Sequence, residues 1–355
     1  MRALRWHGRR DLRVDEIARP TAGTHQAVVR VERVGLCGTD LEEYLHGPVD
    51  IPSGTPHHRS GAIAPLTIGH EVVGIVAECP SDPSLVGQRV IPDVVEGCGE
   101  CFWCQRHEEG LCPDLVVLGQ HADGGLAEYM VCRAATLVPV PDTLSPDTAA
   151  FAEPTAVAAR AVAKAGDLRG TTVIVVGAGV VGNLIAQVAR GHGALVITQD
   201  PAPHRREIAA TMGFATAAER HESAQLCAEH SAGRLADVVF ECAGRQQSLD
   251  DAISLTRRGG TTVLVGLDPE PAAFPWRDVV LGEKRLIGTA AHMWDVDVLA
   301  AVRLLASGVV DPSPLLSRVV AMDAAASALD ELAAPNHLAK VLVDPQMHSA
   351  EGANA

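Results

Sequence analysis

The stretch from residue 171 to residue 200, TTVIVVGAGVVGNLIAQVARGHGALVITQD, constrains the fold of this chain more than any other. Its first apolar run, residues 173–176, predicts a parallel strand buried on both faces. Gly177, Gly179 and Gly182 then form G-x-G-x-x-G as the chain enters a helix. The first glycine permits a tight turn, the second lets the backbone approach a pyrophosphate, and the third lets the helix pack close to its strand. The sequence therefore predicts a dinucleotide-binding unit.

The strand after this helix ends at Asp200, about 20 residues beyond the glycine motif, where a carboxylate accepts hydrogen bonds from the adenosine ribose. A 2′-phosphate at about 4 Å would be repelled by several kcal/mol, so NAD is expected in preference to NADP. Arg205 and Arg206 follow, and the alternative is that they bind a phosphate. The other predicted cofactor contacts, at the helix N-terminus and after a later strand, are Val180, Val181 and Gly266.

Composition agrees with a large soluble enzyme. The 355 residues are 47% hydrophobic, enough for two domains that each have a core. The net charge of −15 and the scattering of the 29 basic residues argue against nucleic acid or an anionic membrane as a partner. The N-terminus has no apolar signal region and no window resembles a spanning helix, so we expect a cytoplasmic protein.

Residues 1–154 read as a β-rich, barrel-like domain because short apolar runs, such as 27–34, 72–76 and 89–95, are separated by Gly, Pro and Asp. A long polar loop at 47–65 carries His57 and His58, which we interpret as solvated, with metal ligation as the alternative.

Residues 155–290 alternate helical patterns with short apolar strands, as in a parallel doubly wound α/β sheet. The segment 291–355 adds two helical patterns, at 296–307 and 324–332, and a strand at 340–343.

Four cysteines lie within a lobe at about residues 96–113. Cys98, Cys101, Cys104 and Cys112 have the spacing C-x2-C-x2-C-x7-C, close enough to enclose one tetrahedral Zn²⁺ with no open position. Such a site is structural, and an iron–sulfur cluster is the alternative. Thiolate ligation also explains a high cysteine content in a reducing compartment.

A second group of possible ligands is dispersed along the sequence. Cys37 occurs in GLCGTD, His70 and Glu71 in IGHE, and Glu153 in FAEPT. Taken singly, each has an ordinary structural explanation. Together, one sulfur, one nitrogen and one or two oxygens suit a catalytic zinc that keeps a position open for water or substrate.

The order of GLCGTD, GHE, the four cysteines, DGGLAEY, AEPTAVA and VGAGVVG resembles the zinc-dependent medium-chain alcohol dehydrogenases over essentially the whole chain. MRALRWHGRRDLRV, CGTDLEEYLHGP and APLTIGHE are most similar to the (R,R)-2,3-butanediol dehydrogenase branch, next to the sorbitol and polyol dehydrogenases. The resemblance implies a GroES-like catalytic barrel, completed by the C-terminal segment, and a Rossmann domain. It places Cys37, His70 and Glu153 at the catalytic zinc, with Glu71 as a glutamate that binds zinc directly or exchanges with water.

The resemblance also implies how a proton leaves. A zinc-bound alcohol must become an alkoxide before it can give up a hydride. Thr39 matches the hydroxyl that begins the relay, and Asp40 matches an acid that orients His70. Where many relatives carry the next relay histidine, this chain has Glu42. If residues 39–45 are helical, Glu42 and His46 could pair as a substitute route, and a solvated helix face is the alternative.

These observations predict an enzyme with two zinc ions per chain. We expect it to transfer a hydride between NAD(H) and a secondary alcohol or ketone, in the class of diols, polyols or cyclitols, and to form a homo-oligomer, either a dimer or a tetramer. A ketone or amino-sugar reductase of specialised metabolism is one alternative. A non-catalytic nucleotide-binding or assembly protein is the other.

Overall fold

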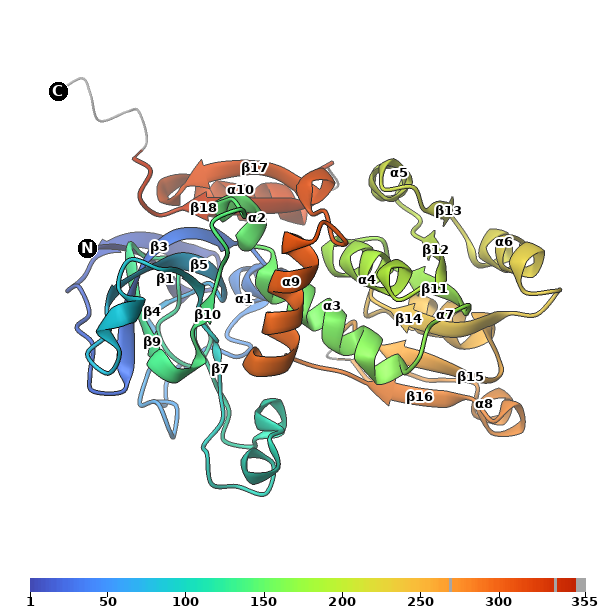
Figure 1. The fold of residues 1–355 in the computed structure, drawn as a ribbon, viewed down its shortest axis with the longest axis horizontal. Helices are drawn as coiled ribbons and strands as arrows, with labels where there is room; N and C mark the ends of the chain where they lie inside the picture. The colour runs from blue at the N-terminus through green and yellow to red at the C-terminus, as the bar shows by residue number, and fades with distance from the viewer. Residues whose placement is uncertain (268–269, 335–336, 349–355) are drawn as a thin grey trace. The chain divides into compact units, whose positions relative to one another are not determined.

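The computed structural model describes residues 1–267, 270–334 and 337–348. It divides into two compact units (Figure 1). Among the described residues, unit 1 contains those of the ranges 1–153, 292–306 and 316–348, and unit 2 contains those of the ranges 154–291 and 307–315. Of the predicted C-terminal segment 291–355, residues 335–336 and 349–355 lie outside the described residues.

Unit 1 is built on a seven-stranded sheet in which β10, β6, β5, β3, β18 and β17 are neighbours in that order and β9 pairs with β3. Its strands are β3 (Gln26–Gly35), β5 (Glu71–Glu78), β6 (Arg89–Ile91), β9 (Tyr129–Arg133), β10 (Val138–Pro139), β17 (Leu316–Ala321) and β18 (Lys340–Asp344). A three-stranded sheet contains β1 (Arg2–Gly8), β2 (Asp11–Glu16) and β4 (Leu66–Thr67). β18, from the end of the chain, pairs with β3, so the C-terminal segment completes the barrel.

The core of unit 1 comes from alternating apolar residues of these strands. In β3, Val29, Val31 and Val34 are fully buried, and β5 contributes Val73 and Val76. The expected strand at 89–95 divides in two, because Pro92 has no N–H to continue the ladder. The chain then enters β7 (Val95–Glu96), which pairs with β8 (Val116–Val117) at the base of the cysteine lobe.

The helices of unit 1 are short. They are α1 (Gly38–His46), α2 (Pro146–Ala149), the first turn of α3 (Ala152–Ala165), α9 (Leu299–Ala306) and α10 (Ala325–Ala333). α9 follows a π-helical turn, Trp294–Val298, so the predicted helix at 296–307 is regular only over its second part.

Unit 2 contains one parallel six-stranded sheet in the order β13-β12-β11-β14-β15-β16. Relative to sequence this is the order 3-2-1-4-5-6. All strands are parallel, but the strand order reverses between β11 and β14, and doubly wound folds bind nucleotides at this switch point. The strands are β11 (Thr172–Val176), β12 (Leu195–Gln199), β13 (Ala215–Ala217), β14 (Ala236–Glu241), β15 (Thr256–Leu264) and β16 (Arg285–Gly288). The predicted combination of a barrel and a Rossmann sheet is confirmed.

The helices of unit 2 cover this sheet. They are the rest of α3 together with α4 (Val180–Gly191), α5 (Pro203–Thr211), α6 (Arg220–His230), α7 (Gln246–Leu255) and α8 (Trp276–Gly282). Residues 307–315 also belong to unit 2, whereas the sequence placed them with the C-terminal segment. The reason is contact with α4: the Asp311 N–H donates to Gln187 Oε1 at 2.7 Å, and Val309 packs against Gly191.

Across the described residues, we find no helix with the length and apolar character needed to cross a bilayer.

Candidate functional site

Three of the dispersed residues come together in unit 1. One ligand atom each from Cys37, His70 and Glu71 lies within 4.8 Å of the other two. Cys37 caps α1 just after β3, His70 directly precedes β5, and Glu71 begins β5, so the pairing of β3 with β5 brings the three residues together. Thr39 Oγ1 lies 3.1 Å from His70 Nε2, which places a hydroxyl at the edge of the set. These donors suit a divalent metal of intermediate softness.

The buried Asp40 supports this set from α1. Its Oδ2 accepts a hydrogen bond from the Cys37 N–H at 2.9 Å, and its Oδ1 lies 3.7 Å from His70 Nδ1. Burial opposes a charge on His70, but Asp40 and Cys37 raise the pKa of its imidazole well above 6.5. A metal cation would take the place of that proton. His70 Nδ1 has no hydrogen-bond partner here, so the described geometry leaves one buried polar atom unsatisfied.

Glu71 forms a buried ion pair with a residue that the sequence analysis did not identify. Lys340 Nζ donates to its two carboxylate oxygens at 2.7 and 2.6 Å and to the Leu36 carbonyl at 3.0 Å. Burial raises the pKa of Glu71, while Lys340 opposes this effect. Gly35 pairs with Glu71 across the strands, and a Cβ at Gly35 would lie 1.9 Å from Glu71 Oε2. The glycine therefore leaves room for this carboxylate.

Glu153 stands at the start of α3 and makes a different contact. Its Oε1 lies 3.3 Å from Nδ1 of His292, a buried residue that was also missed by the sequence analysis. His292 Nε2 is 3.2 Å from Asp93 Oδ1. Burial opposes a charge on His292, but the neighbouring carboxylates of Asp93 and Glu153 raise its pKa to about 10.

Glu42 and His46 lie on α1 as expected, with Glu42 partly buried and His46 exposed. Among the contacts of the described residues, no hydrogen bond or ion pair joins them. The relay through these two residues therefore stays a prediction.

The four lobe cysteines also converge. Cys98 Sγ and Cys104 Sγ are 3.9 Å apart, and Cys101 Sγ and Cys112 Sγ are 3.8 Å apart. A zinc ion with Zn–S bonds of about 2.3 Å requires sulfur separations of about 3.8 Å in a tetrahedron, so the set fits this metal. Backbone hydrogen bonds from Glu100 and Cys101 lower the pKa of the Cys98 thiol to about 7.

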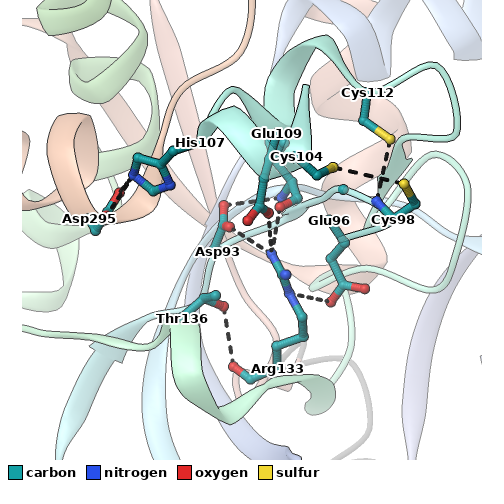
Figure 2. Close-up of polar contacts among 12 residues, drawn as sticks. Asp93, Glu96, Cys98, Cys104, His107, Glu109, Cys112, Arg133, Thr136 and Asp295 are labelled. Atoms are coloured by element: carbon teal, nitrogen blue, oxygen red, sulfur yellow. Dashed lines mark hydrogen bonds and ion pairs between the residues drawn. The ribbon is translucent and has the colours of Figure 1, made fainter. Parts of the chain in front are cut away.

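Arg133 attaches this lobe to the barrel (Figure 2). Its Nη2 lies 3.3 Å from Asp93 Oδ2 and 3.3 Å from Glu109 Oε2, and it donates to the Val95 carbonyl at 3.0 Å. Its Nε lies 3.6 Å from Glu96 Oε1. The lobe therefore depends on charged side chains as well as on its cysteines.

The loop at 47–65 is tied to the same lobe. Arg59 donates to the carbonyls of Glu96, Gly97 and Asp114. His57 is partly buried and stacks on His121, with ring centroids 4.8 Å apart, whereas His58 is exposed. Burial lowers the pKa of both His57 and His121.

Unit 2 contains a cavity of about 470 Å³ at the carboxyl ends of β11, β12 and β14. Each glycine of the motif has a distinct environment. Gly177 adopts φ +100, a Cβ at Gly182 would lie 1.9 Å from the Gly177 carbonyl oxygen, and a Cβ at Gly179 would meet no protein atom within 4 Å. The first and third glycines serve turn and packing, and the second leaves space for a ligand.

Asp200 and Arg205 line this cavity. The buried Asp200 carboxylate accepts hydrogen bonds from the N–H groups of Ala178 and Ala202, both at 2.9 Å, and lies 3.5 Å from Arg205 Nη1. Arg206 instead donates to the carbonyls of Asp200 and Pro201. Of the two arginines, Arg205 is therefore the one positioned to meet a ligand.

The other predicted cofactor residues also belong to unit 2. Val180 and Val181 form the first turn of α4, and Gly266 follows β15. The Gly266 N–H donates to the Glu241 carbonyl at 3.0 Å, and a Cβ at Gly266 would lie 2.2 Å from the Gly244 nitrogen. Gly266 therefore serves close backbone packing in this structure.

A Rossmann sheet with a nucleotide-sized cavity, a barrel with an open Cys/His/Glu set and a closed four-cysteine lobe define a metal-dependent dehydrogenase. Residues 23–142 match the alcohol dehydrogenase GroES-like domain, and residues 180–307 match the zinc-binding dehydrogenase family.

Known proteins resemble the chain over most of its length. L-idonate 5-dehydrogenase (NAD(P)(+)) of Escherichia coli K12 is 32% identical, covering 82% of this chain and 83% of that protein. The structure of 2R,3R-butanediol dehydrogenase from Bacillus subtilis has a TM-score of 0.89 at 28% identity, covering 97% and 99% of the two chains. A Sinorhizobium meliloti 1021 structure with NADP bound has a TM-score of 0.86 at 30% identity, covering 97% and 99%.

The chain belongs to the zinc-dependent medium-chain dehydrogenase family, and it is an oxidoreductase of the alcohol dehydrogenase type.

Proposed function

We propose that this enzyme transfers a hydride between NAD(H) and a secondary alcohol that carries further hydroxyl groups, such as a diol, polyol or cyclitol, or the corresponding ketone. The observation that carries the proposal is the position of Thr39 Oγ1, 3.1 Å from His70 Nε2 and next to the Cys37 and Glu71 donors. The relatives whose names specify L-idonate and butanediol as substrates support the polyhydroxylated class.

We propose two zinc ions per chain, which the two donor sets support. Cys37, His70 and Glu71, whose donor atoms lie together, would hold the catalytic ion together with Glu153, the ligand that the family resemblance implies, and the four lobe cysteines would hold the structural one. A bound catalytic zinc lowers the pKa of a coordinated alcohol so that it ionises near neutral pH. The chain's own task is then to accept and export the proton, and Thr39 lies where that export begins.

For the cofactor we propose NAD in preference to NADP. Asp200 is buried at the cavity wall and fixed by two backbone N–H groups, so its carboxylate cannot turn away from an adenosine ribose. A ribose hydroxyl can donate to this carboxylate, whereas a 2′-phosphate is repelled by it. Arg205 Nη1 lies 3.5 Å from the same carboxylate. The negative charge of Asp200 therefore partly neutralises the positive charge that Arg205 could offer to a phosphate.

We also propose a homo-oligomer in the cytoplasm. β16 is an edge strand of its sheet, and the preceding helix α8 exposes Trp276, Val280 and Leu281 by 69%, 53% and 53%. An exposed apolar helix next to a free strand edge suits contact with a second copy. Cysteines that serve as metal ligands in place of disulfides are typical of a reducing compartment. Trp276→Glu should lower the mass measured by light scattering, and Val86→Glu, at a residue 50% exposed in unit 1, is the control.

The proposed activity is tested by following NADH absorbance with purified enzyme across diols, polyols, cyclitols and amino sugars. We expect turnover of polyhydroxylated secondary alcohols with NAD, together with about two zinc ions per chain by elemental analysis. Activity confined to amino sugars or their ketones would favour a reductase of specialised metabolism. One zinc per chain and no turnover of any substrate would favour the non-catalytic protein.

A further inference from the structure

His292 is a buried histidine enclosed by acidic side chains. Its ring is 2% exposed, with Nε2 at 3.2 Å from Asp93 Oδ1 and Nδ1 at 3.3 Å from Glu153 Oε1. The contact with Asp93 meets the geometry of a hydrogen bond, whereas the contact with Glu153 is an ion pair without ideal alignment. His292 therefore joins Glu153, at the start of α3, to Asp93, in the strand break before the cysteine lobe.

The connection continues beyond Asp93 into the lobe (Figure 2). Asp93 Oδ1 also accepts a hydrogen bond from the Val95 N–H at 3.1 Å, and Asp93 Oδ2 faces Arg133. Arg133 in turn contacts Glu109, whose carbonyl accepts a hydrogen bond from the N–H of the lobe residue Cys112 at 3.0 Å. An unbroken line of charged contacts thus runs from Glu153 through His292, Asp93 and Arg133 to the four-cysteine lobe.

We propose that His292 is a positioning residue that fixes the Glu153 carboxylate and makes its position depend on the cysteine lobe through Asp93 and Arg133. This inference rests on the proposed function, because it takes Glu153 to be a ligand of the catalytic zinc. When one oxygen of a carboxylate contacts an imidazole that is itself held in place, the other oxygen has fewer possible orientations. The anchor is firm because Asp93 is itself held by a backbone N–H and a guanidinium.

The same two segments provide a matched control. His107, in the lobe, pairs with Asp295, three residues after His292, at 2.9 Å. This pair also connects the lobe to the segment that follows β16, but both of its side chains are partly exposed. Among the described residues, the ion-pair partner of Glu153 is His292 and neither member of this pair. Breaking the His107–Asp295 pair tests whether any contact between these segments affects the position of the Glu153 carboxylate, or whether the imidazole of His292 is specifically required.

The experiment compares His292→Gln, His292→Asn and His107→Gln in the full-length enzyme. The Asn amide can reproduce the donor at Nδ1, toward Glu153, whereas the Gln amide reproduces the one at Nε2, toward Asp93. Three readouts are made: the rate at which a chelator removes the catalytic zinc, the visible spectrum after Co²⁺ replaces that zinc, and kcat with KM. We expect His292→Gln to lose zinc about 10- to 100-fold faster, with an altered Co²⁺ spectrum and lower kcat. His292→Asn should bring the zinc-loss rate, the Co²⁺ spectrum and kcat substantially back toward wild-type values. His107→Gln should match the wild type.

Dependence on the lobe is tested with Asp93→Asn, which keeps the side-chain shape and also serves if His292→Gln does not fold. It should shift the Co²⁺ spectrum in the same direction as His292→Gln while the lobe keeps its zinc. A wild-type spectrum and zinc-loss rate in both Asp93→Asn and His292→Gln would overturn the inference. If wild-type enzyme with both zinc ions oxidises no alcohol, the proposed function fails, and the spectra still report whether His292 positions Glu153.

Discussion

Both carboxylate oxygens of Glu71 accept hydrogen bonds from Lys340 Nζ, at 2.7 and 2.6 Å, although the two residues are far apart in the sequence. Glu71 is 1% exposed and Lys340 is 4% exposed, so each charge depends on the other for compensation. The pair connects the start of β5 with the start of β18, and thereby joins the candidate metal site to the strand that pairs with β3.

Removing Lys340 alone should strongly destabilise the fold. Lys340→Met leaves the Glu71 carboxylate buried and unpaired, and we expect it to lower the free energy of unfolding by about 3 to 5 kcal/mol, measured with urea. The double variant Lys340→Met with Glu71→Met should recover most of this loss, because no buried charge remains. A single variant as stable as the wild type would show that the pair contributes nothing to the barrel.

The two cysteine sites should respond differently to substitution. Cys101→Ser should lower the melting temperature and remove one zinc ion per chain, because the lobe loses one of four thiolates. Cys37→Ser should abolish turnover while NAD binding and most of the stability remain. Thermal unfolding, zinc analysis and NAD titration measure these effects. Equal losses of stability in both variants, with activity falling in proportion, would contradict the division into structural and catalytic metals.

Asp200 should determine the cofactor preference. Asp200→Ser should weaken NAD binding by about 10- to 100-fold through lost charged hydrogen bonds and should improve binding of NADP. Arg205→Ala should reduce binding of NADP by the Asp200→Ser enzyme, whereas Arg206→Ala, at a side chain turned to backbone carbonyls, should not. Fluorescence titration with NADH and NADPH measures both. Wild-type enzyme that binds NADPH tenfold more tightly than NADH would contradict the prediction.

Proton release should require Thr39 whichever group acts next. Thr39→Val should lower kcat for alcohol oxidation by about 10²- to 10⁴-fold near neutral pH. If Glu42 and His46 continue the route, Glu42→Gln and His46→Ala should each slow oxidation, with non-additive effects and smaller losses at high pH, where hydroxide can collect the proton. Wild-type rates for both variants from acid to alkaline pH would identify them as an exposed helix face.

The loop at 47–65 should loosen in mild acid. Burial holds the pKa of His57 and His121 below the ordinary value of 6.5, so the folded loop favours their neutral rings. This contribution to stability is complete above about pH 6.5 and is lost as the pH falls through the lowered values. NMR titration of ¹³C-labelled histidine rings should give values below 6.5. His121→Asn, which keeps an acceptor for the Val117 N–H, should reduce the acid sensitivity of the loop to proteolysis.

The cofactor motif and the cysteine lobe could be predicted because each is local. G-x-G-x-x-G lies within one strand–turn–helix unit, and the four lobe cysteines lie within 15 consecutive positions, Cys98 to Cys112. Spacing alone then fixes what such residues can enclose. For the second metal set, the mixture of ligand types and the resemblance to alcohol dehydrogenases predict Cys37, His70 and Glu153 with Glu71 as the neighbouring glutamate, and the structure brings the donor atoms of Cys37, His70 and Glu71 together.

Only the tertiary structure decided which carboxylate is paired with which cation. Lys340 meets Glu71 across a separation of 269 residues, and His292 meets Asp93 across 199. No local periodicity encodes such contacts, because they depend on the late strand β18 joining β3 and on the chain returning from unit 2 to unit 1 at His292. The sequence by itself determined most of the elements, the spacing of the candidate ligands in the cysteine lobe and the nucleotide turn. Tertiary packing decided the partners of the buried carboxylates Glu71 and Glu153, because a charge that is removed from water must be paired with a group that the fold brings close to it.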